Sequence, residues 1–250
     1  MQIVVDGLVT EYKRSGKGPL LLFLHGWGDS SKTFDGLVAK FESAYTCVRL
    51  DLPGFGASEI PEGVWSLGSY ADFVQHFLQK ISVGSVFALV GHSNGGAIAL
   101  KGLESGTLQA DKLILLASSG IRPKKTIKIS LIKVGAKVGK QLTKILPRAN
   151  QQALRKALYK KIGSDYLAAP QMAATFKKVV REDISQDLPQ VAVPVLLVYG
   201  EADTDTPLWI ARKFAALLPQ ADLHVVKLAG HFVHHDALAE TQQAMEEFLK

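Results

Sequence analysis

The chain has 250 residues, of which 47% are hydrophobic, so it is long enough to bury a full core. We expect one domain with an insertion, because large α/β units of this length often form a single domain. The single cysteine, Cys47, excludes an internal disulfide, and no apolar run approaches the roughly 18 residues that span a bilayer. The first residues lack the basic start of a signal peptide, so we expect a cytoplasmic protein.

The net charge of +6 is unevenly distributed along the chain. Residues 122–181 hold 16 Lys and Arg against one acidic residue, Asp165, which gives a net charge of +15. The rest of the chain is acidic, with 13 basic against 22 acidic residues. The basic character of the protein therefore belongs to this one segment.

Apolar runs alternate with amphipathic segments along most of the chain. Residues 1–5 and 8–14 predict an antiparallel hairpin around the turn Asp6-Gly7. Further strands are expected at Leu20–Leu24, Cys47–Leu50, Val86–Val90, Lys112–Ala117, Pro194–Tyr199 and Asp222–Leu228. Helices are expected at Thr33–Glu42, Tyr70–Ile81, Asn94–Glu104, Leu208–Leu218 and Leu238–Leu249. This alternation predicts an α/β fold, with a mostly parallel central sheet and helices on both of its faces.

The alternation breaks after the sixth predicted strand, at Ser118-Ser119-Gly120. Apolar residues then recur at spacings of three and four, which predicts an amphipathic helix: Leu131, Val134, Val138, Leu142 and Ile145. The opposite stripe of that helix consists of Lys133, Lys137, Lys140 and Lys144. Pro147 and Pro170 divide the segment into shorter helices. We interpret residues 120–182 as a basic helical insertion into a core formed by residues 1–119 and 183–250.

The run Gly91-His92-Ser93-Asn94-Gly95-Gly96 lies between a predicted strand and a predicted helix. A serine at the apex of such a turn is lifted out of the sheet with its hydroxyl exposed, and the flanking glycines avoid collisions where the helix crosses the strand. This geometry suits a nucleophile. The G-x-S-x-G pattern alone is weak evidence, so the assignment of Ser93 depends on the groups that accompany it.

A serine hydroxyl needs a neutral imidazole that takes its proton during attack. We expect His231 to be this base, because it alone among the seven histidines follows the last predicted strand directly after a glycine. His234 and His235 are the alternatives, and we expect them to begin or flank the last helix. A metal site formed by these three histidines and Asp236 is a weaker hypothesis, since it lacks a spaced partner.

The carboxylate that orients the imidazole is expected just beyond a strand end, where functional groups gather in open α/β sheets. Asp203 lies at that place in the run Gly200–Pro207, and the order nucleophile, acid, histidine is kept along the chain. Asp205 is expected instead to cap the helix that Pro207 opens.

Together with His25-Gly26-Trp27-Gly28 and the run Asp51–Ser58, these motifs resemble the α/β-hydrolase superfamily, in its small single-domain esterase-like branch, over essentially the whole chain. The resemblance implies an α/β-hydrolase fold with a helical cap inserted at residues 120–182. It also implies that the main-chain N–H groups of Trp27 and Asn94 form an oxyanion hole, and that neither a cofactor nor a metal is required.

The resemblance thus implies hydrolysis of a carboxylic ester of a small or medium apolar acyl group through an acyl-enzyme intermediate. Carbon-carbon bond hydrolases, thioesterases and acyltransferases use the same triad, and a ligand receptor with little turnover is a further alternative. The expected partner is a small-molecule ester, and no motif supports nucleotide or nucleic-acid binding. For the lysine stripe two hypotheses stay open, namely contact with anionic material, either a membrane surface or an acidic substrate, and a solvated helix face.

Overall fold

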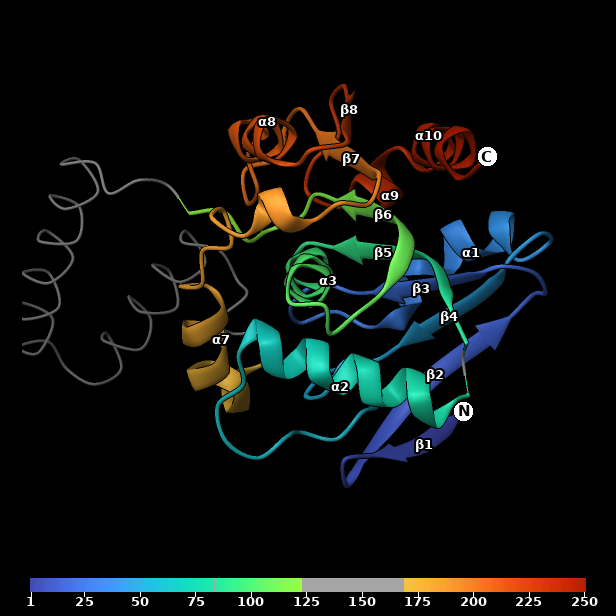
Figure 1. Ribbon diagram of the computed structural model, residues 1–250, viewed down its shortest axis with the longest axis vertical. Coiled ribbons are helices and arrows are strands. Elements are labelled where there is room, and N and C mark those ends of the chain that lie inside the picture. Colours follow the sequence, from blue (N-terminus) through green and yellow to red (C-terminus); the bar gives the residue numbers. More distant parts are fainter. Residues whose placement is uncertain (83, 123–168) are drawn as a thin grey trace, which may run out of the picture.

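A single twisted sheet forms the centre of the computed structural model, which describes residues 1–82, 84–122 and 169–250. Its eight strands follow the order β1-β2-β4-β3-β5-β6-β7-β8 (Figure 1). The strands are β1 (Gln2–Val5), β2 (Leu8–Ser15), β3 (Leu20–Leu24), β4 (Thr46–Leu50), β5 (Val86–His92), β6 (Ala110–Leu116), β7 (Val195–Gly200) and β8 (Ala221–Val226). β2 pairs antiparallel with β1 and β4, whereas the other neighbouring strands are parallel. The predicted mostly parallel sheet is therefore confirmed.

Helices cover both faces of the sheet (Figure 1). One layer contains α2 (Leu67–Lys80), α3 (Asn94–Glu104) and α8 (Leu208–Leu217), and the other contains α1 (Asp35–Phe41) and α10 (Leu238–Leu249). The strand β3 serves both cores, because successive side chains of a strand point to opposite faces. Leu22 and Leu24 pack in the first core, while Leu21 and Phe23 pack in the second, and all four are fully buried. Each such side chain contributes about 1.5–3 kcal/mol of burial free energy.

Several element boundaries differ from the sequence-based expectation for local reasons. The helix α2 begins at Leu67 rather than Tyr70, because Ser66 and Ser69 exchange the hydrogen bonds of a capping box. The last strand ends at Val226, before a turn in which Leu228 takes a φ of 61° and is 90% exposed. The N-terminal hairpin is as expected, with Val5 opposite Leu8 across the turn.

The predicted insertion is described only at its two ends, residues 120–122 and 169–182. The second end contains a 3₁₀ turn, η3 (Pro170–Met172), and α7 (Ala173–Val179). Met172 and Val179 from this end are buried in the first core, with Leu22 and Leu24. The amphipathic pattern from Leu131 to Ile145, with its lysine stripe, lies outside the described residues, so its proposed contacts stay predictions.

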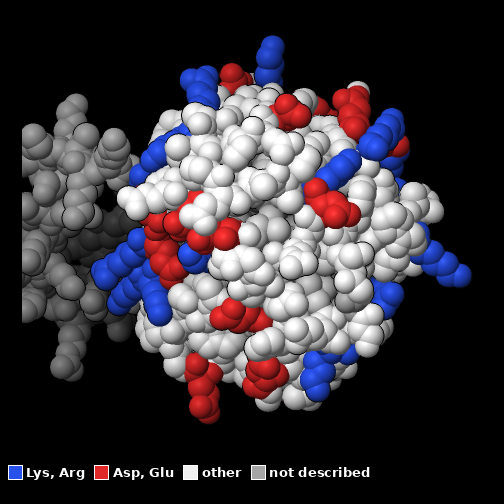
Figure 2. Space-filling view, in the orientation of Figure 1, with Lys and Arg blue, Asp and Glu red and all other residues white. Residues whose placement is uncertain are grey.

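The charge of the described residues is opposite in sign to that of the whole chain. They hold 17 Lys and Arg against 22 Asp and Glu, so the basic excess of the protein belongs to residues 123–168. On the face drawn in Figure 2, acidic and basic side chains are interspersed. Within the described part of the chain, no helix is both long and apolar enough to cross a membrane.

Candidate active site

Ser93 lies in the turn between β5 and α3, with φ 50° and ψ −115°. A non-glycine residue with positive φ is strained, and such strain is retained where the surroundings impose it. The surroundings here are tightly packed, because a Cβ on Gly95 would overlap the main-chain oxygen of Leu24, and one on Gly91 would overlap the backbone of Gly96. The glycines predicted to flank the serine are therefore required by the close approach of helix and strand.

Asp203 and His231 face one another from the loops that follow β7 and β8. Oδ2 of Asp203 accepts a hydrogen bond from Nδ1 of His231 at 2.9 Å, and the Asp203 side chain is fully buried. Because a carboxylate can only accept, Nδ1 carries the proton in the neutral imidazole and Nε2 is left as the acceptor. This is the tautomer that a general base requires.

Thr206 completes the surroundings of the Asp203 carboxylate, and sequence reasoning did not find it. Its hydroxyl donates to Oδ2 of Asp203 at 2.7 Å, and its main-chain N–H donates to Oδ1 at 2.9 Å. Burial alone would raise the pKa of Asp203, but the hydrogen bonds from His231 and Thr206 outweigh burial and lower that pKa. The available signal was the spacing Asp203-x-x-Thr206 in a turn before a helix.

The expectation that Asp205 caps the following helix is wrong. Pro207 occupies the N-cap position of α8, and no side chain caps that helix. The main-chain N–H of Asp205 instead donates to Oδ1 of Asp203 at 2.8 Å, and the residue lines the pocket that contains Ser93. The tight turn around Asp203 therefore uses the main-chain N–H of Asp205.

The loop after β3 lies directly over the serine turn. A Cβ on Gly26 would lie 3.2 Å from the Cβ of Ser93, so only glycine allows this approach without displacement. The buried His25 supports the loop, because its Nδ1 donates to the oxygen of Gly26 at 2.7 Å and its Nε2 accepts from the N–H of Leu52 at 2.9 Å. Burial lowers the pKa of His25 and keeps it neutral for both contacts.

The run that begins at Asp51 forms a turn that braces this loop. The carboxylate of Asp51 accepts main-chain N–H groups from Ser31 at 2.7 Å and Ala57 at 2.8 Å. Burial would raise the pKa of Asp51, but the hydrogen bonds from the Ser31 side chain and from the main chain of Ala57 and Ser31 lower it. The turn that begins at Asp51 therefore has a structural role.

The two residues expected at the oxyanion hole come from different loops, Trp27 from the loop after β3 and Asn94 from the start of α3. Trp27 is half-buried, and its indole packs against Phe55 at 4.8 Å and Phe176 at 5.1 Å between ring centroids. Asn94 is the first residue of α3, where main-chain N–H groups have no acceptor within their own helix. Asn94 thus follows Ser93 directly in the chain, and Trp27 lines the same pocket as Ser93, while their role as oxyanion donors stays a prediction.

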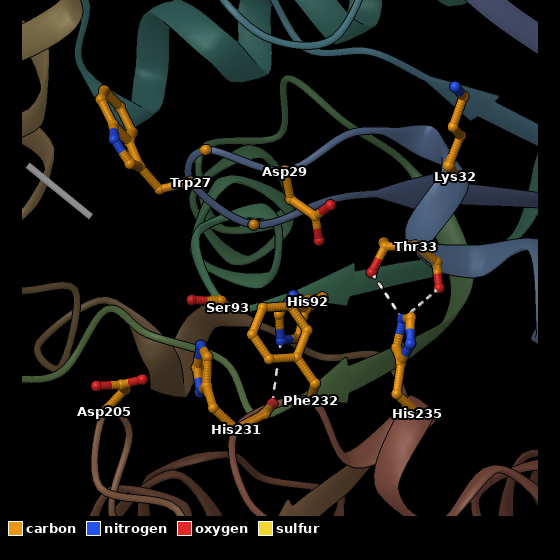
Figure 3. A pocket seen from close by; sticks show the side chains of 12 residues that line it. Trp27, Asp29, Lys32, Thr33, His92, Ser93, Asp205, His231, Phe232 and His235 are labelled. Carbon is orange, nitrogen blue, oxygen red and sulfur yellow. Dashed lines mark hydrogen bonds between the residues drawn. The ribbon is translucent and has the colours of Figure 1, made fainter. Parts of the chain in front are cut away.

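A pocket of about 620 Å³ joins these loops. Ser93, Asp205 and His231 line it together with Gly26, Trp27, Gly28, Asp29, Lys32, Thr33, His92, Phe232 and His235. In Figure 3 the Ser93 hydroxyl and the His231 imidazole face the same cavity, with the Trp27 indole at one end. Among the described residues that line the pocket, Trp27 and Phe232 are the large apolar side chains. The lining is therefore more polar than the binding of an apolar acyl group alone would require.

The alternative histidines do not approach Asp203. Nε2 of His234 and Nε2 of His235 each lie 3.0 Å from the hydroxyl of Thr33, on the other side of the pocket. Asp236 accepts the main-chain N–H of Gly230 at 2.7 Å, and among the described residues it does not form a possible metal-binding group with these histidines.

One group of potential metal ligands does occur in the described residues, namely Asp203, Asp205 and His231, whose ligand atoms lie within 4.8 Å of one another. Both oxygens of Asp203 already accept hydrogen bonds there. The hydrogen-bond network therefore accounts for this cluster.

The fold and this arrangement of loops are those of an α/β hydrolase. The family profile described as the alpha/beta hydrolase family matches residues 21–244, and the chain belongs to this family. It is therefore a hydrolase built on the α/β-hydrolase fold.

Individual relatives are similar over most of their lengths. The chain is 27% identical to a pimeloyl-acyl-carrier-protein methyl ester esterase of Aliivibrio salmonicida, over 90% of each chain. It is 24% identical to a 2-(acetamidomethylene)succinate hydrolase of Mesorhizobium japonicum, over 99% of this chain and 94% of the relative. Among solved structures, a bacterial membrane phospholipase A has a TM-score of 0.79 at 24% identity, covering 100% of this chain and 84% of that chain. That structural likeness shows the shared fold.

Proposed function

We propose that this hydrolase cleaves a carboxylic ester through an acyl-enzyme intermediate, with Ser93 as nucleophile, His231 as base and Asp203 as the carboxylate that orients it. The observation that carries the proposal is the 2.9 Å hydrogen bond between Asp203 and His231, whose imidazole faces the same pocket as Ser93. The esterase among the sequence relatives supports the same reaction class.

In the proposed reaction, Oγ of Ser93 forms a bond to the ester carbonyl carbon while its proton passes to Nε2 of His231. The tetrahedral intermediate then expels the alcohol oxygen, which takes this proton from the imidazolium. A water molecule repeats the two proton transfers and releases the acid from Ser93. The Asp203 carboxylate stabilises the imidazolium in both halves of the reaction and keeps the required tautomer.

For the negative charge that develops on the carbonyl oxygen, we propose the main-chain N–H groups of Trp27 and Asn94 as donors. The N-terminus of α3 supports this assignment, because the helix dipole places partial positive charge beside Ser93. The indole of Trp27, held between Phe55 and Phe176, offers an apolar surface for the acyl group. Cleavage of a thioester, or of a carbon-carbon bond next to a carbonyl, would require the same groups. A substrate panel should therefore compare esters with compounds of these two classes.

The test is turnover of p-nitrophenyl butyrate with labelling by a fluorophosphonate probe. Ser93→Ala should abolish labelling and lower kcat by about 10⁴ or more. The matched control is Ser105→Ala at the other end of α3, an exposed position that should leave kcat within about twofold. Labelling that survives Ser93→Ala, or a wild-type burst without sustained turnover, would contradict the proposal, and the latter outcome would favour a receptor.

A further inference from the structure

His92, which directly precedes Ser93, is enclosed by groups from three loops of the site: its own turn, the loop after β3 and the loop after β8. Its side chain is 1% exposed, and its ring centroid lies 4.9 Å from that of His231 and 4.7 Å from that of His234. A Cβ placed on Gly26 would lie 3.0 Å from its Nδ1, so the loop after β3 passes directly over the imidazole. One buried side chain therefore contacts the serine turn, the histidine loop and the loop expected to bind the oxyanion.

The polar contact of His92 joins two distant parts of the chain. Its Nε2 lies 3.1 Å from the main-chain oxygen of His231 (Figure 3). A carbonyl oxygen can only accept, so Nε2 of His92 carries the hydrogen. The strand β5 that ends at His92 is separated in the sheet from β8, which leads to His231, by β6 and β7. At the carboxyl ends of the parallel strands, this hydrogen bond therefore connects the serine turn to the histidine loop.

The charge state of His92 matches this role. Burial, followed by the neighbouring His234 and His231, holds the pKa of His92 well below its ordinary value, and His25 acts in the same direction. The imidazole is thus neutral, with its hydrogen on Nε2 and none on Nδ1. Nδ1 has no hydrogen-bond partner among the described residues, so the single donor of this ring is committed to the His231 carbonyl.

We propose that His92 is a positioning residue, whose Nε2–H holds the main chain of His231 so that the imidazole is aligned with Ser93. This inference rests on the proposed roles of Ser93 and His231. Asp203 holds the imidazole of His231 through Nδ1, and this contact by itself permits the ring to move together with its loop. A second attachment at the main chain removes that freedom. Alignment has a large effect on proton transfer, since a misplacement of 1 Å can lower a rate by about 10²-fold.

The test compares His92→Gln with His92→Asn. The amide nitrogen of Gln can reach the place of Nε2, whereas that of Asn reaches only the place of Nδ1. Both variants lose the imidazole ring, but only Gln keeps a hydrogen-bond donor at the place of Nε2, so comparing them isolates the effect of the donor. The readouts are the second-order rate constant for phosphonylation of Ser93 by a fluorophosphonate, kcat and KM for p-nitrophenyl butyrate, and the melting temperature. Phosphonylation depends on Ser93 and His231 and does not require that an ester be the natural substrate.

We expect His92→Asn to lower the phosphonylation rate constant and kcat by about 10- to 100-fold, with KM changed less than about threefold. His92→Gln should recover most of both rates, at a melting temperature similar to that of the Asn variant. Equal rates in the two variants, or rates that follow only the folded fraction, would overturn the inference. If the wild type reacts with the probe but hydrolyses no ester, the proposed ester specificity fails while the comparison still decides the role of His92.

Discussion

The hydroxyl of Thr206 donates to Oδ2 of Asp203 at 2.7 Å, the same carboxylate oxygen that accepts Nδ1–H of His231. Asp203 and Thr206 are each 4% exposed, and they belong to the same turn. With the two main-chain N–H groups on Oδ1, the carboxylate has a donor for each oxygen from its own loop. The turn that contains the proposed acid therefore holds its carboxylate through contacts of its own, in addition to the one from His231.

Replacing Thr206 by Val keeps the side-chain shape and removes this donor. Because the hydrogen bond lowers the pKa of Asp203, its loss should raise that pKa, so the acidic limb of the kcat profile should move to higher pH. The free energy of unfolding should also fall by about 1–3 kcal/mol, since the acceptor is charged and buried. Thr206→Ser is the control that keeps the hydroxyl. A pH profile shared by the Val variant and the wild type would contradict the role given to Thr206.

Substitutions at Asp203 and at Asp205 should differ in their effect on kcat for p-nitrophenyl butyrate. Asp203→Asn should lower kcat by roughly 10⁴, because an amide N–H at this place favours the wrong imidazole tautomer. Asp205→Asn keeps its main-chain contact with Asp203 and should change kcat less than about tenfold. If the Asp205 variant proves to be the inactive one, the assignment of the acid is wrong.

Acid pH should destabilise the fold through His234. Burial, followed by the charges of His235 and His231, lowers the pKa of His234 to about 3. In the unfolded chain a histidine binds a proton near pH 6.5, so below that pH the unfolded state holds more protons. The free energy of unfolding should therefore fall as pH decreases from about 6.5, by up to about 1.4 kcal/mol per pH unit for this group.

Urea unfolding between pH 7.5 and pH 5 measures this effect, with His234→Gln as the variant that removes the titrating group. The variant should show a shallower dependence on pH below 6.5 than the wild type, whatever its stability at neutral pH. Parallel curves for the two proteins would show that His234 does not contribute.

Cys47 should react with a thiol reagent only when the protein unfolds. It lies in β4 with no exposed surface, and burial raises the pKa of its thiol to about 12. The reactive thiolate is therefore both inaccessible and scarce at neutral pH. A disulfide-exchange reagent such as dithionitrobenzoate should release about one equivalent of thionitrobenzoate in urea and almost none in buffer. Rapid reaction of the native protein would contradict the buried position of Cys47.

The sequence by itself determined the elements that form the sheet and the segments that carry the candidate site. Continuous apolar runs such as Leu20–Leu24 indicate strands buried on both faces, and the helix Asn94–Glu104 has the bounds that the sequence predicted. These features follow from periodicity and from glycine spacing, which are local properties of the chain. The position of Asp203 beyond a strand end was readable for the same reason.

Only the tertiary structure decided which polar groups come into contact in the loops at the carboxyl ends of the strands. Thr206 and Asp205 lie in one short turn, but they contact Asp203 differently. Thr206 does so through its side-chain hydroxyl, whereas Asp205 does so through its main-chain N–H. The hydrogen bond from His92 to His231 joins residues 139 positions apart, so no local pattern could indicate it. Sequence periodicity reports which face of an element is buried, whereas the partner of a buried polar atom depends on how distant loops pack together.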